Sequence, residues 1–388
     1  MKRTYEEINQ RIKKGDAVVM TAEEVIGVVE RQGIESATKE VDVVTTGTFG
    51  AMCSSGAFLN FGHSEPPIKM TKVWLNDVPA YAGIAAVDAY IGATELREDG
   101  NVEYGGAHVI EDLIARRPVR LRATSPGTDC YPRKEIDTYI SLATINQAYM
   151  YNPRNAYQNY GVATNSSDRT LFTYMGKLLP KYGNATYSSA GQLSPLLKDP
   201  HLRTIGIGTR IFLGGAQGYV AYEGTQYRTT TTERNGVPTG ASRNIAVCGE
   251  LRDMSTEYVR ALSFNKYGVS LAVGLGIPIP ILDEDMMRCV SVRNEDIYAP
   301  VLDYAVQSRA RMPFHEVTYA ELRSGSIEMG GKKVRTSSLS SYAKALQVAE
   351  TLKRSIQEGE FLLTEKVASL PEERTQRTLD LHSRDEVA

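Results

Sequence analysis

The chain has 388 residues, and its 44 lysines and arginines nearly balance its 46 aspartates and glutamates, for a formal net charge of −2. That balance excludes the basic footprint of a nucleic-acid-binding protein and the polybasic patch of a membrane-surface protein. The length suffices for one large domain or two ordinary ones with an ample core. We therefore expect no nucleic-acid partner and no membrane partner.

Compartment and redox state follow from the N-terminus and the cysteines. The opening segment, MKRTYEEINQRIKKGD, is charged throughout and lacks the apolar stretch of a signal peptide. The four cysteines have neither CxxC spacing nor the spacing of zinc or iron–sulfur ligands. We predict a cytoplasmic protein with reduced thiols that binds no metal or cofactor itself.

The first elements read as strand, helix, strand. Residues 17–20 are apolar, and Thr21 with Glu24 predicts a capping box ahead of a helix that Gly33 is placed to end. A second strand is expected over residues 41–45. This unit is typical of parallel sheets, in which ligands bind beyond the carboxyl ends of the strands.

A glycine-rich segment with a cysteine follows that second strand. It reads TTGTFGAMCSSGAFLNFG, and Gly47, Gly50 and Gly56 surround Cys53. Glycines in such a loop let a chain present backbone N–H groups to an anion. We therefore expect Cys53 at the carboxyl end of a strand, in a loop suited to a reactive thiol.

A second cysteine occupies a similar place further along. Residues 119–124 alternate apolar and polar side chains like a half-buried strand, and Cys130 follows within ATSPGTDCYPRKEID. A helix start is expected over residues 129–135, with Arg133 beside the thiol. A helix N-terminus and cations both lower the pKa of a cysteine, so Cys130 is the second candidate for a reactive thiolate.

The remaining segments complete the predicted fold. Small residues favour a closely packed helix over 82–93, an amphipathic pattern favours one over 255–266, and a buried strand is expected over 269–282. Together they predict an α/β fold of mixed or mostly parallel sheets with flanking helices. We expect one catalytic domain over residues 1–362, with room for two sub-lobes, and a charged C-terminal tail over 363–388.

Several other features are open to more than one interpretation. The glycines at 214–218 form either a hairpin turn or an anion cradle. The tyrosines and asparagines of residues 139–187 suit internal packing, a pocket wall or the interface of a homo-oligomer, which we expect the protein to form. Cys248 and Cys289 lie in apolar or helical patterns and are expected in the core.

Three further side chains are candidates for the site. His63 follows Cys53 by ten residues and suits a proton donor or a structural contact. Arg133 and Arg154 suit the carboxylate of a substrate, because a guanidinium binds a carboxylate through two hydrogen bonds, or they are ordinary surface cations.

At the strings TTGTFGAMCSSGAFLNFGH and SPGTDCYPRKE the chain resembles the homocysteine-biosynthesis family, the L-aspartate semialdehyde sulfurtransferases of anaerobic archaea and bacteria. The resemblance covers residues 2–362. It implies conversion of L-aspartate 4-semialdehyde to L-homocysteine, with Cys53 and Cys130 as the family's two cysteines and a persulfide on Cys130. It also implies a ferredoxin-like partner whose iron–sulfur cluster supplies the electrons.

The residues permit that chemistry. A persulfide on Cys130 can add its outer sulfur to the aldehyde carbon, and Cys53 can then attack the enzyme-side sulfur and leave a Cys53–Cys130 disulfide. His63 is the candidate general acid. The order of the two cysteines can be reversed without contradicting the sequence. Either order requires that their Cα atoms come within about 7 Å in the working conformation.

Other functions also fit parts of the sequence. The same cysteine pair suits a thiol redox or peroxide-consuming enzyme. The opening segment is vaguely similar to CoA-transferase-like proteins, which carry out acyl transfer through a glutamate and do not need either thiol. A binding module without catalysis is the remaining alternative, and its ligand affinity would survive Cys53→Ala or Cys130→Ala.

Overall fold

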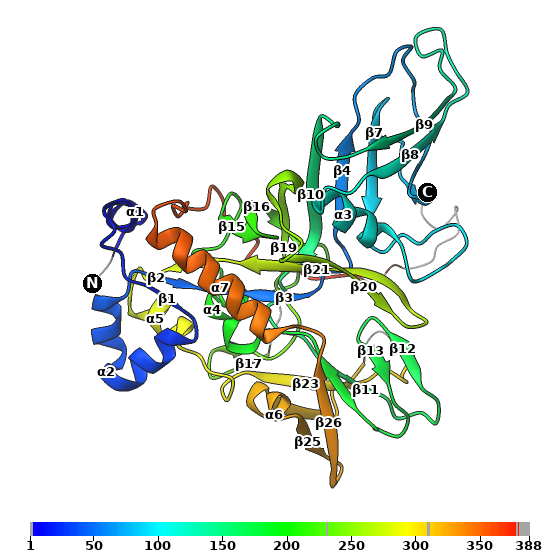
Figure 1. Ribbon diagram of the computed structural model, residues 1–388. Coiled ribbons are helices and arrows are strands. Elements are labelled where there is room, and N and C mark those ends of the chain that lie inside the picture. Colours follow the sequence, from blue (N-terminus) through cyan, green and yellow to red (C-terminus); the bar gives the residue numbers. More distant parts are fainter. Residues whose placement is uncertain (1–2, 230–231, 309–310, 378, 380–388) are drawn as a thin grey trace, which may run out of the picture.

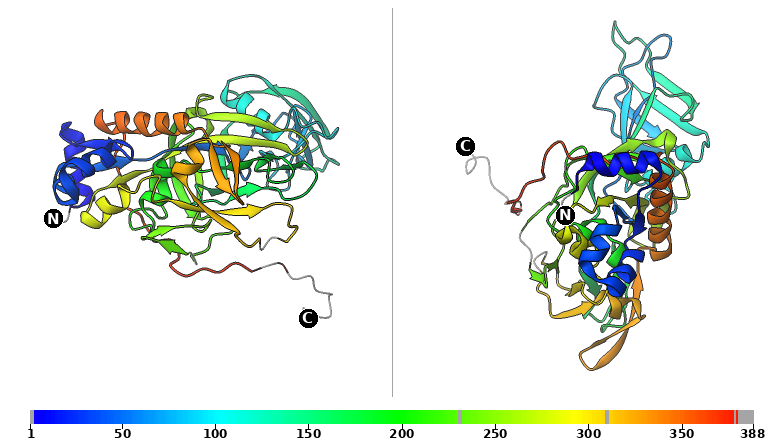
Figure 2. Two further views of the ribbon diagram at one scale, coloured as in Figure 1. Left: turned by 90° about the horizontal axis from the view of Figure 1, so that it is seen from below. Right: turned by 90° about the vertical axis from the view of Figure 1, so that its left-hand side faces the viewer.

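Figure 1 shows the computed structural model, which describes residues 3–229, 232–308, 311–377 and 379. A central sheet crosses the molecule. An outer lobe of strands projects from one of its ends, a second group of strands lies below it in this view, and several helices gather around the N-terminus. Figure 2 shows the outer lobe projecting from the body in two further views.

The central sheet has nine strands. Eight of them follow in spatial order as β20 (Val259–Phe264), β21 (Gly268–Gly276), β15 (Arg210–Leu213), β16 (Ala216–Glu223), β19 (Ile245–Glu250), β10 (Gln147–Asn155), β4 (Gly56–Asn60) and β7 (Asp88–Gly92). The ninth, β3 (Thr48–Ala51), pairs with β21. Since β3 and β4 follow each other in the chain but pair near opposite ends of this order, the sheet curls toward a barrel.

A small sheet near the N-terminus holds the predicted strand–helix–strand unit. β1 (Val19–Thr21) and β2 (Val43–Thr45) pair in parallel, and β22 (Pro278–Pro280) joins β2. The connecting helix is α2 (Glu24–Glu40). Its capping box is confirmed, because the backbone N–H of Thr21 donates to the Glu24 carboxylate and that of Glu24 donates to the Thr21 hydroxyl. Gly33 makes a kink inside the helix instead of ending it.

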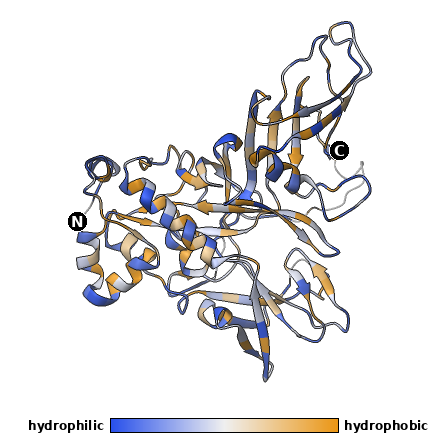
Figure 3. Cartoon of the chain, in the orientation of Figure 1, coloured by the Kyte–Doolittle hydropathy of each residue, from blue (hydrophilic) through white to orange (hydrophobic). Residues whose placement is uncertain are grey.

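Three helices surround these two sheets, namely α1 (Tyr5–Lys14), α5 (Glu284–Val290) and α7 (Tyr342–Gln357). Hydrophobic and hydrophilic residues alternate along α7 in Figure 3, as expected of an amphipathic helix. Its buried stripe, which includes Val348 and Leu352, faces β1, β3 and β21. This packing holds β3, the strand that leads to Cys53, against α7.

The strands below the central sheet form a six-stranded sheet in the order β24 (His315–Thr318), β23 (Tyr298–Asp303), β11 (Val162–Thr164), β14 (Ala185–Tyr187), β26 (Lys332–Ser338) and β25 (Ser326–Met329). The short elements beside it are β12 (Leu171–Thr173), β13 (Gly176–Leu178), β17 (Glu233–Arg234), β18 (Val237–Pro238), α4 (Pro195–Lys198) and α6 (Tyr319–Arg323), with 3-10 turns at Gly191–Leu193 and Leu251–Asp253.

The outer lobe is a four-stranded sheet in the order β6 (Val78–Ala80), β5 (Lys72–Leu75), β8 (Val119–Thr124) and β9 (Glu135–Ile140), with α3 (Gly106–Ile114) at its base. The strand predicted over residues 119–124 is confirmed as β8, and its residues alternate between buried and half-buried. We call residues 61–67 and 125–134 the tip loops, because they lie at the distal end of this lobe in Figure 1.

The predicted α/β class is wrong. In the part of the chain that the structure describes, only the β1–β2, β11–β23 and β14–β26 pairings are parallel, and the pairings within the central sheet are antiparallel. Short links such as the Gly214–Gly215 turn between β15 and β16 join neighbouring strands directly, which permits only antiparallel pairs. The parallel unit at the start of the chain does not extend into the large sheet.

The predicted positions of both cysteines change accordingly. Cys53 follows β3, an antiparallel strand, so the carboxyl edge of a parallel sheet does not present it. Cys130 does not begin a helix: Thr128 and Tyr131 exchange backbone hydrogen bonds of 2.9 and 3.1 Å in a tight turn, and β9 follows. Helices expected over 82–93 and 255–266 are replaced by β7 and β20, because both segments pair with neighbouring strands.

The described part of the C-terminal tail packs on the body. Leu363 and Leu370 are buried, and the backbones of Ile207 and Val367 are joined by a hydrogen bond of 2.8 Å. The described helices include none that is long and apolar enough to cross a membrane.

Candidate active site

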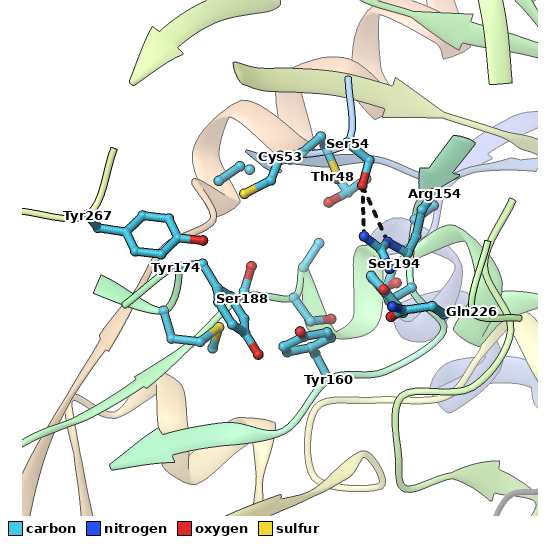
Figure 4. Close-up of a pocket in the computed structure, with 18 residues that line it drawn as sticks. Thr48, Cys53, Ser54, Arg154, Tyr160, Tyr174, Ser188, Ser194, Gln226 and Tyr267 are labelled. Carbon is cyan, nitrogen blue, oxygen red and sulfur yellow. Dashed lines mark hydrogen bonds between the residues drawn. The ribbon is translucent and has the colours of Figure 1, made fainter. Parts of the chain in front are cut away.

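A cavity of about 240 Å³ opens between the central sheet and the six-stranded sheet. Figure 4 shows its lining. The lining residues are Thr48, Gly50, Ala51, Met52, Cys53, Ser54, Arg154, Ala156, Tyr157, Tyr160, Tyr174, Met175, Ser188, Ser189, Ala190, Ser194, Gln226 and Tyr267. Within this described lining Arg154 is the one basic residue, and there is no aspartate or glutamate. The cavity can therefore bind a ligand through an anionic group such as a carboxylate.

Cys53 lies in the turn that joins β3 to β4. The turn is fixed on both sides, because the backbone N–H of Met52 donates to Leu271 over 2.7 Å and that of Ser55 donates to Met52 over 3.0 Å. The hydroxyl of Ser270, on β21, donates to the Cys53 sulfur over 3.3 Å. This hydrogen bond holds the Cys53 sulfur in place at the edge of the cavity.

Glycines near Cys53 serve packing. A Cβ on Gly47 would come within 2.1 Å of the Ala345 carbonyl oxygen on α7, and one on Gly56 would come within 2.0 Å of the Tyr90 hydroxyl. Gly50 lies in β3, opposite Val273. These glycines hold the strands close to their neighbours, and Gly50 and Gly56 belong to β3 and β4, while Cys53 itself lies in the short turn between those strands.

Arg154 reaches the cavity from the end of β10. Its Nε and Nη2 atoms donate to the Ser54 hydroxyl over 3.3 and 3.2 Å. The neighbouring Asn152 is fully buried and donates to Ser55 over 2.9 Å, which ties this end of β10 to the Cys53 turn. No carboxylate lies in the described lining of the cavity to pair with Arg154, so its guanidinium can donate hydrogen bonds to a carboxylate of a substrate.

Tyrosine hydroxyls line the opposite wall. The Tyr174 and Tyr304 hydroxyls lie 3.0 Å apart, and burial raises the pKa of Tyr160. In Figure 4 the hydroxyl of Tyr267 and the sulfur of Cys53 lie on the same side of the cavity. Burial, followed by the nearby Cys53, raises the pKa of Tyr267. Tyr267 therefore keeps its proton at neutral pH and can donate it.

Cys130, His63 and Arg133 lie together in the tip loops. Cys130 is exposed. His63 stacks on Tyr131 with ring centroids 6.0 Å apart. The Arg133 side chain donates to the carbonyls of Glu65 and Pro66 over 2.6 and 2.9 Å, so it joins one tip loop to the other.

The structure thus divides the five predicted site residues into two groups. Cys53 and Arg154 share the cavity, whereas Cys130, His63 and Arg133 share the tip of the outer lobe and do not line it. Sequence reasoning missed Tyr267 and Ser270, which reach Cys53 through the pairing of β21 with β3. The tyrosine-rich segment was the available signal for the wall that contains Tyr157, Tyr160 and Tyr174.

Comparison with known proteins gives this arrangement a family. The family described as "Homocysteine biosynthesis enzyme, sulfur-incorporation" matches residues 17–363. The chain belongs to this family. It is therefore an enzyme of sulfur incorporation in homocysteine biosynthesis, and the resemblance carried by the two cysteine motifs is confirmed.

Relatives from methanogenic archaea are similar along most of this enzyme. The L-aspartate semialdehyde sulfurtransferase of Methanosarcina acetivorans is 52% identical over 379 residues, which cover 98% of this chain and 74% of the relative. That of Methanocaldococcus jannaschii is 52% identical over 383 residues, covering 95% of this chain and 73% of the relative. A protein of Methanothermobacter thermautotrophicus is 31% identical over 84% of this chain and 73% of its own length. No solved structure matches the chain.

Proposed function

We propose that this enzyme is an L-aspartate semialdehyde sulfurtransferase, which converts L-aspartate 4-semialdehyde to L-homocysteine through a cysteine persulfide. The observation that carries the proposal is the cavity beside Cys53, whose one charged lining side chain in the described part of the chain is Arg154. A substrate with a carboxylate at one end and an aldehyde at the other fits a guanidinium and a thiol on one cavity wall. The names of the relatives at 52% identity support the same substrate.

The substrate is held by its carboxylate in this scheme. Arg154 and Ser54 present N–H and O–H groups that face the cavity, and hydrogen bonds between a guanidinium and a carboxylate are among the strong ones in proteins. The aldehyde carbon then lies toward Cys53 and Tyr267. Tyr267 donates its proton to the aldehyde oxygen as sulfur adds to the carbon.

Sulfur transfer then proceeds in balanced steps. The outer sulfur of a Cys130 persulfide bonds to the aldehyde carbon, whose oxygen takes a proton and becomes a hydroxyl. The Cys53 thiolate attacks the inner sulfur, forms a Cys53–Cys130 disulfide and releases the substrate as a hydroxy-thiolate. Loss of water gives a thioaldehyde. Two electrons and two protons reduce it to the thiol of homocysteine, and two more of each restore the dithiol.

The electrons must come from another molecule, and we assign a ferredoxin-like iron–sulfur protein as the partner that carries the cluster. The scheme needs both cysteines as thiols at rest, and the four described cysteines are free. A reducing compartment such as the cytoplasm suits this requirement. A CoA-transferase-like mechanism is disfavoured, because the described lining of the cavity holds no glutamate.

Mass spectrometry after incubation with polysulfide tests the persulfide. We expect the Cys130 peptide to gain the mass of one sulfur atom, which a reductant removes, and the Cys289 peptide to remain unmodified. Burial raises the pKa of Cys289 to about 11, so it stays protonated and unreactive. An unmodified Cys130 peptide would contradict the assignment of the sulfur carrier.

A further inference from the structure

The two thiols of the proposed reaction lie at opposite ends of β4. Cys53 precedes Gly56 at one end of this strand, and the tip loops begin beyond Asn60 at the other. At a rise of about 3.3 Å per residue the strand alone spans about 13 Å. A disulfide requires Cα atoms within about 7 Å. The two cysteines of one chain are therefore too far apart to react in this conformation.

A movement of the outer lobe cannot close this distance without breaking the central sheet. All five residues of β4 pair with β10 on one side and with β7 on the other. The start of β4 is fixed as well, because Ser55 accepts a hydrogen bond of 2.9 Å from the buried Asn152. β4 thus acts as a rigid spacer between Cys53 and the tip.

The Cys130 loop cannot reach back along the lobe by itself. Its ends are joined by a hydrogen bond of 2.7 Å from the Ser125 N–H to the Lys134 carbonyl. Arg133, next to Lys134 in this loop, joins the loop to the other tip loop through its side chain and its backbone N–H. The loop therefore holds Cys130 exposed at the tip of the lobe.

We propose that the working site forms between two copies of the chain, in which the tip loops of one copy enter the mouth of the Cys53 cavity of the other. This inference rests on the proposed two-thiol function. Cys130 of one copy then delivers the persulfide sulfur to substrate held by Arg154 of the other, and Cys53 of that copy attacks the inner sulfur. The disulfide formed in each turnover joins the two copies, and the partner protein reduces it.

The surface of the outer lobe fits a covering second copy. Tyr81 and Tyr139 are 64% and 68% exposed, and Phe58 and Tyr149 on the adjoining strands are 40% and 46% exposed. β9, which carries Tyr139, is an edge strand of its sheet. Exposed aromatic side chains beside an unpaired strand edge are typical of protein interfaces. A second copy both completes the site and removes these side chains from water.

Complementation between two inactive variants tests the proposal. Cys53→Ala and Cys130→Ala are co-expressed with different tags, and the assembly that carries both tags is purified. In a two-fold dimer of this composition, one of the two sites combines an intact Cys53 with an intact Cys130, so we expect about half of the wild-type activity per chain. A site within one chain would give no activity.

The matched control is a dimer for which the shared site and the single-chain site predict the opposite results. A dimer of one wild-type copy and one Cys53→Ala/Cys130→Ala copy has no complete site if the thiols come from different copies, and one complete site if they come from the same copy. Activity of about half in this dimer, with none in the complemented one, would overturn the shared site and leave the two-thiol function intact. Full activity of either single variant alone would instead overturn the proposed function.

Oxidation gives a second test that does not depend on catalysis. In a Cys248→Ala/Cys289→Ala background, a mild thiol oxidant should produce a species of twice the chain mass on a non-reducing gel, and peptide mapping should join Cys53 to Cys130. Loss of that species in Cys53→Ala excludes a Cys130–Cys130 link. A Cys53–Cys130 disulfide at the mass of a single chain would contradict the inference.

Discussion

The Cys53 cavity and the tip of the outer lobe both carry a cysteine beside an arginine, yet they differ in almost every physical respect. In the cavity the thiol accepts a hydrogen bond from Ser270, and the Arg154 guanidinium lines the cavity while donating only to the Ser54 hydroxyl among the described hydrogen bonds of its side chain. At the tip Cys130 is exposed, and the Arg133 guanidinium is occupied by two backbone carbonyls. One region is built to hold a small anion, and the other is built to present a thiol.

This difference separates the two halves of a sulfur transfer, uptake of sulfur from a donor and its addition to the aldehyde. A thiol that collects sulfur must be accessible to a donor, whereas the aldehyde and the thioaldehyde derived from it are better kept from water. A cavity excludes water and an exposed loop admits the donor. The division also explains why one copy of the chain does not hold both thiols in one place.

Loss of either thiol gives the largest expected effect. Cys53→Ser and Cys130→Ser should each lower homocysteine formation by roughly 10⁴-fold or more, since each removes a nucleophile that no neighbour replaces. The two variants should still differ in sulfur uptake. Cys53→Ser should still gain a sulfur atom on the Cys130 peptide in mass spectrometry, and Cys130→Ser should gain none.

Cys248→Ala is the matched control for the thiol variants. Cys248 lies on β19, outside both regions, and burial raises the pKa of its thiol. Its activity should stay near that of the wild type. If Cys53 and not Cys130 gains the sulfur, the roles assigned to the cavity and the tip are reversed.

Tyr267→Phe is expected to have the next largest effect. The Tyr267 hydroxyl lies on the same side of the cavity as the Cys53 sulfur, and burial raises its pKa, so it carries a proton at neutral pH. Its loss should lower kcat by about 100-fold with little change in KM. Tyr222→Phe, at a side chain that is 63% exposed on β16, is the control and should leave kcat unchanged. Steady-state kinetics of both variants show whether the general acid lies in the cavity. An unchanged kcat in Tyr267→Phe would exclude Tyr267 and favour His63 as the general acid.

Arginine variants compare the two regions directly. Arg154→Gln should raise KM for the semialdehyde by roughly 30-fold, because a charge-assisted pair contributes about 2 kcal/mol. Arg133→Gln should leave that KM unchanged, since its guanidinium binds the tip loops together. Arg154→Lys should fall between wild type and Arg154→Gln. Equal KM values in the two glutamine variants would show that Arg154 does not bind the substrate.

Local patterns predicted several elements correctly and the overall class wrongly. The strict alternation in Val119–Thr124 and the capping box of Thr21 and Glu24 depend on neighbours in sequence, and both formed as predicted. Residues 255–266 also have a helical pattern, yet Val259–Phe264 pair with β21 in a strand. Pairing partners decide such segments, and the sequence of the segment does not name its partner.

The residues of the candidate site were likewise predictable only where they depend on local sequence. Turn-forming sequence around Cys53 and Cys130 made both thiols candidates, and Arg154, a candidate for the carboxylate of a substrate, lines the cavity together with Cys53. Ser270 on β21 and Tyr267 in the turn just before that strand lie more than two hundred residues later in the chain, and the pairing of β21 with β3 brings them to Cys53. Long-range registers of this kind leave no local pattern in the sequence.

Two glycine-to-alanine variants, one before each thiol, are expected to have the smallest effects. Gly47→Ala would place a Cβ 2.1 Å from the Ala345 carbonyl oxygen on α7, a backbone contact that cannot move aside cheaply, and overpacking of this kind costs about 3 kcal/mol. Gly127→Ala, in the Cys130 loop, would meet the flexible Lys134 side chain at 3.1 Å and the Pro132 carbonyl oxygen at an ordinary 3.5 Å, and would keep a φ of +81°, at a cost of about 1 kcal/mol. At roughly 2 °C per kcal/mol, Tm should fall by about 6 °C and about 2 °C. Calorimetry of the two variants measures this ratio.

The same two variants also differ in their expected effect on kcat. Because β3 leads directly into Cys53, Gly47→Ala should lower kcat, whereas Gly127→Ala should lower it only if the tip loop enters a site. If Gly127→Ala changes Tm and leaves kcat unchanged, the tip loop takes no part in the reaction.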